Sequence, residues 1–137
     1  MLVVICGSMS ASHEMVSVKH KLIHIGHEVI LPSHAEEYAN GSIKMENNRE
    51  STQNKIEGNL IQEYFETIRG ADAVLAVNVD KRGIRGYIGG NTFLEMGFAH
   101  VLGKKLFVLN EIPESPYRDE IFAMQPMVLE GDLSKLT

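Results

Sequence analysis

The chain has one cysteine, no tryptophan and no apolar run approaching the ~20 residues of a membrane-spanning helix. A single cysteine cannot form an intrachain disulfide, which suits a reducing compartment. The first residues contain neither a basic stretch nor a long apolar stretch, so we expect no signal peptide. These absences predict a cytoplasmic protein that does not associate with a membrane.

An excess of positive charge is also missing. The formal net charge is −5, and the small cationic cluster of Lys81, Arg82 and Arg85 falls in a glycine-containing loop. A surface that binds a nucleic-acid polymer needs a basic patch, so we expect no such partner. Small anions are a different case, because backbone N–H groups can hold them without net positive charge.

What the sequence does contain is typical of one globular domain over residues 1–137, with 44% hydrophobic and 23% charged residues. Apolar runs alternate with segments of helical periodicity, which predicts a parallel, doubly wound α/β sheet. The expected strands are 2–6, 27–31 (stopped by Pro32), 73–77, 105–109 and 127–129. The expected helices are 12–25, 55–69, one that ends near Gly103, and 116–124. Five strands at this spacing favour the flavodoxin-like order 2-1-3-4-5.

The first predicted helix shows both faces clearly. Its core stripe consists of Met15, Val18, Leu22 and Ile25, and His13, His20 and His24 share the opposite face. The spacing of His20 and His24 is compatible with zinc, but no cysteine or paired carboxylate joins them. We therefore predict no metal site. Cys6 is predicted to be a buried residue of the first strand.

The segment from Gly89 to Ala99 carries the strongest functional signal. A double glycine leads into a helix that follows a hydrophobic strand, and Glu95 is expected in the first turn of that helix. Such a carboxylate lies at the carboxyl edge of the sheet, where open α/β folds bind ligands. The helix dipole favours its ionised form, as a nucleophile toward a sugar carbon requires. The alternative interpretation is a capping box in which Glu95 reaches back to Thr92.

Several other residues are candidates for ligand contact. The first loop, Gly7 to Ser12, lies at the expected crevice but matches neither a P-loop nor a dinucleotide fingerprint. Its alternative role is a tight turn with Ser12 as helix N-cap. Asp80 either forms a turn or binds a sugar hydroxyl. The loop aromatics Tyr38 and Tyr87 either cover a base or pack the loop down.

The polar segment Ser33–Thr52 shows little periodicity and is expected to be a long loop or a short mobile helix beside the site. Its few apolar residues cannot offset the entropy of ordering it. We therefore expect this segment to act as a lid that a bound ligand orders.

Three motifs together resemble the nucleoside 2-deoxyribosyltransferase superfamily, which includes the 2′-deoxynucleoside 5′-phosphate N-hydrolases. These motifs are Ile5-Cys6-Gly7-Ser8, Gly70-Ala71-Asp72-Ala73-Val74 and Leu94-Glu95-Met96-Gly97-Phe98-Ala99, and the similarity runs from Leu2 to about Leu129. The resemblance implies a flavodoxin-like fold, cleavage of an N-glycosidic bond, and a homodimer or higher homo-oligomer. It also implies that Glu95 is the nucleophile and that Gly7, Ser8 and Met9 line the base and sugar site. The loop residues Gly89, Gly90 and Asn91 would hold the 5′ end of the substrate.

Two positions depart from the family pattern. Tyr64 stands where the family often has an aspartate that serves the leaving base, and a phenol is a weak acid at neutral pH. Phe122 stands where the family has a serine or asparagine that reads the 5′ end across the subunit interface.

The sequence thus predicts an N-glycosidase that acts on a nucleoside or nucleoside 5′-monophosphate without a cofactor. Hydrolysis is favoured over base transfer because no clear feature selects a second base. The alternative is a non-catalytic nucleotide-binding or sensor module, which the loss of the aspartate at Tyr64 supports. A flavin-binding protein is disfavoured because the chain has no tryptophan and few loop aromatics to sandwich the ring system.

Overall fold

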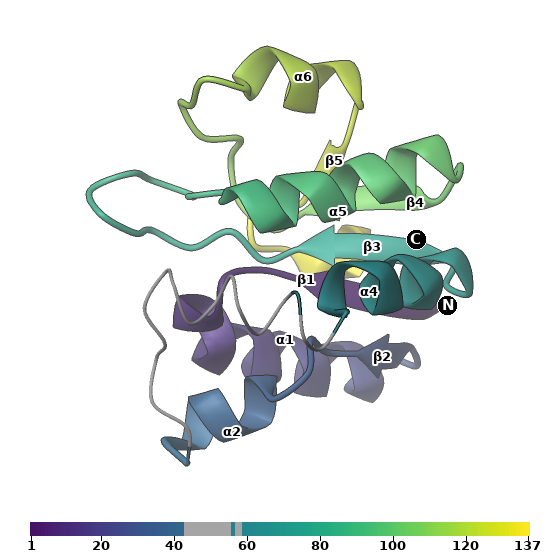
Figure 1. Cartoon of the computed structure of the whole chain (residues 1–137). Coiled ribbons are helices and arrows are strands. Elements are labelled where there is room, and N and C mark those ends of the chain that lie inside the picture. The colour runs from purple at the N-terminus through teal and green to yellow at the C-terminus, as the bar shows by residue number, and fades with distance from the viewer. Residues whose placement is uncertain (43–55, 57–58) are drawn as a thin grey trace.

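The computed structural model describes residues 1–42, 56 and 59–137. Its centre is a five-stranded sheet in the order β2-β1-β3-β4-β5, in which every neighbouring pair is parallel (Figure 1). The strands are β1 (Leu2–Cys6), β2 (Glu28–Ile30), β3 (Ala73–Ala76), β4 (Lys105–Val108) and β5 (Met127–Val128). The flavodoxin-like order predicted from the sequence is confirmed.

Helices cover both faces of the sheet. They are α1 (Ser12–His24), α2 (Ala35–Asn40), α4 (Leu60–Arg69), α5 (Gly90–Val101) and α6 (Arg118–Ala123), with short 3-10 helices η1 (Met9–Ala11) and η2 (Leu133–Lys135). Figure 1 shows α4 and α5 side by side on one face, and α1 packs on the other.

The core has two halves because successive strand residues point to opposite faces. Val3 and Ile5 of β1 pack with α1, whereas Val4 and Cys6 pack with α4 and α5. All four residues are fully buried, which explains why this strand reads as a continuous apolar run. Cys6 is therefore buried, as expected.

The first helix differs from its prediction at both ends. Met15, Val18 and Leu22 are buried as expected, but Ile25 is 51% exposed, because α1 ends at His24 and Gly26 turns the chain away from the core. At the other end Ser12 is not the N-cap. Ser8 instead caps η1, and its hydroxyl accepts a hydrogen bond from the Ser10 N–H at 3.3 Å.

Residues 35–40 of the predicted lid segment form α2, which packs against α1 and is tied to it by an ion pair of 2.7 Å between Lys19 and Glu36. The rest of that segment, residues 43–52, lies outside the described residues, and so does most of the predicted start of α4. In the part of the chain that the structure describes, no helix has the length and apolar character needed to cross a membrane.

Candidate functional site

Glu95 lies with Cys6 and Tyr64 at the carboxyl edge of the sheet, between α4, α5 and the end of β1. The Glu95 side chain is buried, at 7% exposure, and shares a hydrogen bond with the Cys6 thiol. The pKa of Cys6 is raised well above its ordinary value, mainly by burial and to a smaller extent by the neighbouring Glu95 carboxylate. The thiol therefore stays protonated at neutral pH and can donate its hydrogen to the carboxylate.

The position of Glu95 within its helix differs from the prediction. Helix α5 begins at Gly90 with Gly89 as N-cap, so Glu95 is in the second turn and the first turn holds no acidic residue. Thr92 is inside the helix and buried rather than at its cap, so the capping box does not form. Because the dipole acts mainly within the first turn, burial and the Cys6 contact define the environment of Glu95 more than the helix end does.

The Tyr64 hydroxyl is engaged with the backbone of β1. It donates a short hydrogen bond to the carbonyl of Ile5. The pKa of Tyr64 is raised well above its ordinary value, mainly by burial and to a smaller extent by the nearby Cys6 and Glu95. The phenol therefore keeps its proton.

The strand register explains why the Ile5 carbonyl is available. The Glu28 N–H donates to the Met1 carbonyl. The register that follows pairs β2 with β1 in parallel, Glu28 with Leu2, Val29 with Val3 and Ile30 with Val4. In a parallel ladder every second N–H points to the same neighbour, so the donor due opposite Ile5 belongs to Pro32. Proline has no N–H. Tyr64 therefore supplies a donor that the sheet itself cannot provide.

The first loop follows Cys6 directly. A Cβ on Gly7 would lie 3.1 Å from both the Met15 sulfur and the Val77 carbonyl oxygen, so only glycine fits here without displacing a neighbour. Next to it, the Ser8 hydroxyl accepts a hydrogen bond of 3.0 Å from the Lys81 ammonium group. Met9 begins η1, which leads into α1, and His13 in the first turn of α1 is exposed as predicted.

Asp80 closes the loop between β3 and α5. Its carboxylate accepts a hydrogen bond of 2.9 Å from the Gly86 N–H, and the side chain is otherwise exposed. Lys81 and Ile84 then exchange two backbone hydrogen bonds across Arg82 and Gly83, both of which have positive φ, as a two-residue hairpin turn requires. These bonds agree with the turn-forming interpretation of Asp80.

Asn78 joins this loop to the one after β4. The buried side chain donates to the carbonyls of Gly86, Asn110 and Glu111 at 3.0–3.2 Å and accepts from the Asn110 N–H at 2.9 Å. Sequence reasoning missed Asn78, although a polar residue at the end of a buried strand was a usable signal. It also missed the contacts of Cys6 with Glu95 and of Lys81 with Ser8.

The remaining predicted residues fall into two groups. Gly90 and Asn91 lie at the exposed start of α5, and Gly89 lies against the Tyr87 ring, which a Cβ would meet at 3.3 Å. Tyr38 lies on α2, whose neighbour α1 covers the face opposite Glu95. The structure thus brings Tyr87 to the predicted 5′-end loop, whereas Tyr38 comes from the other side of the sheet.

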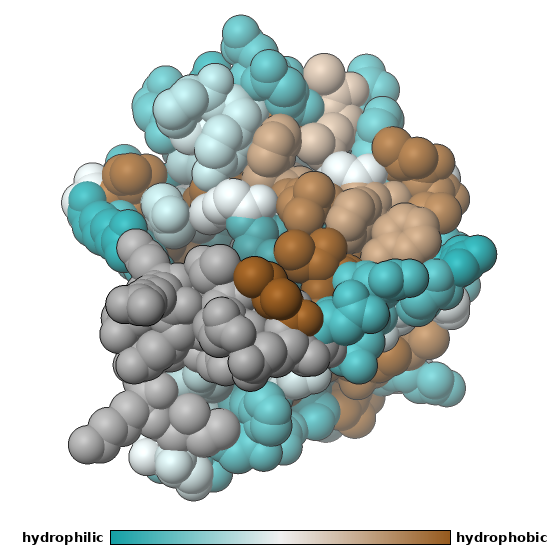
Figure 2. Space-filling model, in the orientation of Figure 1, coloured by the Kyte–Doolittle hydropathy of each residue, from teal (hydrophilic) through white to brown (hydrophobic). Residues whose placement is uncertain are grey.

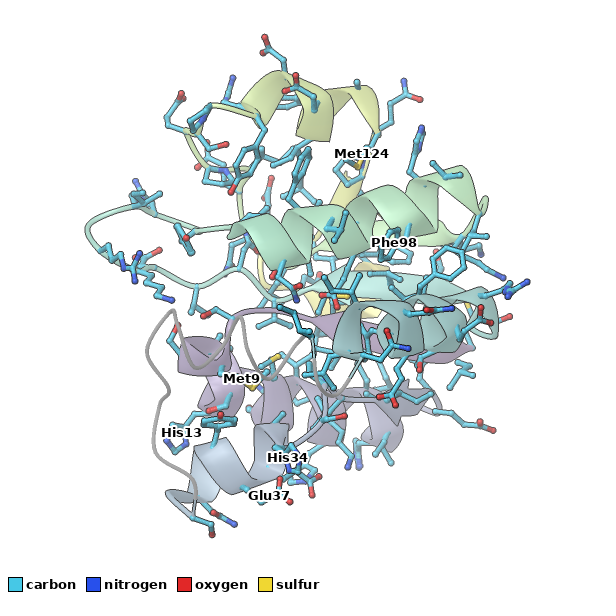
Figure 3. All side chains as sticks on the ribbon, in the orientation of Figure 1. Met9, His13, His34, Glu37, Phe98 and Met124 are labelled. Atoms are coloured by element: carbon cyan, nitrogen blue, oxygen red, sulfur yellow. The ribbon has the colours of Figure 1, made fainter. Side chains whose placement is uncertain are left out.

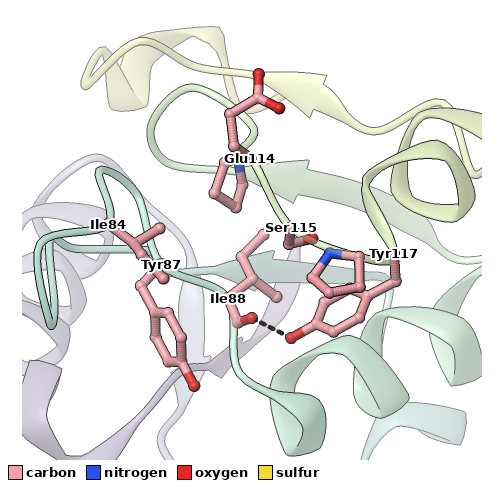
Figure 4. Close-up of a pocket in the computed structure, with 8 residues that line it drawn as sticks. Ile84, Tyr87, Ile88, Glu114, Ser115 and Tyr117 are labelled. Carbon is pink, nitrogen blue, oxygen red and sulfur yellow. Dashed lines mark hydrogen bonds between the residues drawn. The ribbon is translucent and has the colours of Figure 1, made fainter.

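Two hollows are found, one beside the loop that precedes α5 and one along α5 itself. The first, of about 240 Å³, lies between the loops that follow β3 and β4 (Figure 4). There the Tyr117 hydroxyl donates to the Ile88 carbonyl at 2.5 Å, and the buried Ser115 hydroxyl has no hydrogen-bond partner among the described residues. Neither Glu95 nor the first loop belongs to its lining.

The second hollow is an apolar groove of about 420 Å³ along α5. Phe98 and Met124, labelled in Figure 3, are among the residues that line it, as is Val101, which is 83% exposed. Apolar side chains gather over this part of the surface in Figure 2.

No group of three or more metal-ligating side chains occurs in the described ranges 1–42, 56 and 59–137. The described side chains at the site are a carboxylate, a thiol, a phenol and, across the first loop, an ammonium group.

Comparison with known proteins places this geometry in context. No protein-family model matches the chain, and no curated protein matches its sequence. Among solved structures, the CMP N-glycosidase BcmB of Clostridium botulinum is similar, with a TM-score of 0.52 and 15% sequence identity over 93% of this chain and 85% of that one. The two chains share a fold. BcmB is named for the cleavage of an N-glycosidic bond, which is also the reaction that the sequence resemblance implies.

Proposed function

We propose that the chain is an N-glycosidase that acts on a nucleoside or nucleoside 5′-monophosphate, with Glu95 as the nucleophile. The observation that carries this proposal is the buried carboxylate of Glu95 beside Cys6 at the carboxyl edge of the parallel sheet. Open α/β folds bind their ligands at this edge. The likeness to an N-glycosidase in fold and the resemblance in the motif Leu94–Ala99 support the same reaction.

In the proposed reaction a Glu95 oxygen attacks the anomeric carbon of the sugar. The bond from this carbon to the base nitrogen breaks through an oxocarbenium-like transition state, and the base leaves with the electron pair. Water then attacks the same carbon, the ester bond to Glu95 breaks, and the proton from water passes to the departed base or to solvent. The Cys6 thiol holds the Glu95 carboxylate in place by donating its hydrogen.

The experiment is incubation with a panel of nucleosides and nucleoside 5′-monophosphates, scored chromatographically for free base. Glu95→Gln should lower the rate of base release by roughly 10³-fold or more, the scale on which nucleophiles contribute. Its free energy of unfolding should stay within about 1 kcal/mol of the unmodified chain. The control is Glu111→Gln, an exposed glutamate after β4, which should keep full activity. An equally active Glu95→Gln protein would contradict the covalent mechanism.

A second candidate function is a nucleotide-binding or sensor module without catalysis. The observation that favours it is the Tyr64 hydroxyl, which donates to the Ile5 carbonyl and occupies the position of the family's base-serving aspartate. In this case Glu95 would hydrogen-bond to sugar hydroxyls. Calorimetric binding of a nucleotide, together with no released base from any member of the panel, would favour this module over the enzyme.

A further inference from the structure

The loop between β3 and α5 fixes one cation in space. The Tyr87 N–H donates to the Val79 carbonyl at 3.1 Å, Asp80 holds the Gly86 N–H, and Lys81 pairs with Ile84 across the tight turn. These bonds form a small hairpin, residues 79–87. Because the backbone on both sides of Lys81 is bonded, the start of its side chain has a defined position and direction.

The Lys81 ammonium group sits between the first loop and an aromatic ring. It donates to the Ser8 hydroxyl at 3.0 Å and lies 5.4 Å from the centre of the Tyr87 ring. An ammonium group has three N–H donors, and the Ser8 bond uses one of them. Among the residues that the structure describes no other acceptor bonds to it, so two donors are available there for oxygen atoms of a ligand.

No carboxylate balances this charge in the described part of the chain. The ion pairs there join Lys19 to Glu36, His34 to Glu37, Arg69 to Glu66 and Arg118 to Glu114. The adjacent Asp80 is engaged with the Gly86 N–H. Partial burial, and then the neighbouring Arg82, lower the pKa of Lys81, which is the effect expected of a cation without a counter-charge.

Lys81 and the proposed nucleophile Glu95 are linked through the end of β1 and the first loop. The thiol that bonds to Glu95 belongs to Cys6, and the hydroxyl that bonds to Lys81 belongs to Ser8, two residues later. Two residues of extended chain span at most about 7 Å. On the other side, the Tyr87 ring lies against Gly89, the N-cap of α5. Lys81 and Glu95 therefore contact the same short stretch of chain, residues 6–8.

We propose that Lys81 is a specificity-determining residue that binds a phosphate monoester on the sugar, so that the site selects nucleoside 5′-monophosphates over nucleosides. This inference rests on the proposed function for the identity of the substrate. The compact, strongly hydrated ammonium group is a common partner of phosphate oxygens.

The test compares Lys81→Met, which keeps the chain length without the charge, with Lys81→Arg and with Arg85→Gln as a control for net charge. Kinetic constants are measured for a nucleoside and its 5′-monophosphate. We expect Lys81→Met to raise KM for the monophosphate about 10- to 100-fold, the scale of a charged hydrogen bond, with little change for the nucleoside. Lys81→Arg should recover much of this loss, and Arg85→Gln should change KM less than about threefold.

A second measurement does not depend on catalysis. Calorimetry with ribose 5-phosphate should detect binding to the unmodified chain that weakens with salt and is lost in Lys81→Met. If base is released but Lys81→Met affects nucleoside and monophosphate equally, the inference is overturned while the proposed function stands. If no substrate loses its base but ribose 5-phosphate still binds through Lys81, the proposed function fails and the anion site stands. If ribose 5-phosphate binds both proteins equally, Lys81 is not an anion ligand.

Discussion

Replacing Tyr64 with phenylalanine should lower the free energy of unfolding, because it removes the hydroxyl that donates to the Ile5 carbonyl. A buried acceptor that loses its donor costs about 1–3 kcal/mol, and Tyr64 is the one donor to this carbonyl among the described residues. For a chain of this size, each kcal/mol lowers Tm by roughly 3–5 °C. The measurement is urea unfolding followed by circular dichroism, with the slope of the transition compared between the two proteins to check that only stability has changed.

The N–H that Pro32 lacks provides a sharper test of this effect. Pro32→Ala would supply the N–H that the ladder lacks opposite Ile5. In a protein that carries Pro32→Ala, Tyr64→Phe should therefore lower the free energy of unfolding by less than it does in the unmodified chain. The double-mutant cycle should give a coupling energy of about 0.5–2 kcal/mol between the two positions. Pro32→Ala alone also increases the conformational entropy of the unfolded chain, which lowers the free energy of unfolding by about 0.4–1 kcal/mol. The double-mutant cycle subtracts this effect.

The same variant tests the role of Tyr64 in catalysis. Because its proton is committed to a backbone carbonyl, the rate of base release should change less than about tenfold, well below the 10²- to 10⁴-fold contribution typical of a general acid. An equal cost of Tyr64→Phe in both backgrounds, or a cost near zero, would refute the reasoning about the ladder. A rate loss of a thousandfold in a stable protein would instead assign the phenol to the leaving base.

Two further predictions concern the loop architecture and the assembly. Gly86→Ala should lower the free energy of unfolding by about 2–4 kcal/mol in urea unfolding, because φ is +64° and a Cβ would lie 2.7 Å from the Glu111 carbonyl oxygen. Gly131→Ala is the control. There φ is +77° but no atom lies within 4 Å of the new Cβ, so this variant measures the backbone part of the destabilisation alone. We also expect at least a dimer at micromolar concentration, with the apolar groove along α5 as the contact surface. Light scattering should then give a mass at least twice the 15.3 kDa of one chain, and Val101→Glu should lower the measured mass. A 15.3 kDa species alone would contradict the dimer.

The sheet could be predicted from the sequence because its signals are local. Continuous apolar runs marked the strands buried on both faces, and the 3.6-residue period marked the inner face of α1. The error at Ile25 lies at a helix end, where one residue of difference moves a side chain from the core to the surface.

The site was less accessible to the same reasoning. The double glycine suggested a loop, because glycine costs a helix interior about 1 kcal/mol relative to alanine. Packing overrides this low helix propensity of glycine. Helix α5 begins at Gly90, and its buried side chains include Thr92, Glu95 and Met96. This early start moves Glu95 into the second turn.

The contacts that build the site join residues far apart in the sequence. The bond from Tyr64 to Ile5 spans 59 positions, and the bond from Lys81 to Ser8 spans 73. Neither residue pair belongs to a periodic pattern, so spacing alone could not predict either bond. These contacts depend on the strand order, which places the ends of β1 and β3 side by side.

The hydrogen bonds of Asn78 have a consequence for engineering the chain. Because one amide side chain holds the backbone of Gly86 and of Asn110 and Glu111, the two loops behave as a single mechanical unit. A loop exchange meant to alter substrate choice must therefore transfer both loops together with Asn78. The hairpin tip at Arg82 and Gly83 lies outside this unit, so a graft at the tip would change the setting of Lys81 while leaving the hydrogen bonds of Asn78 in place.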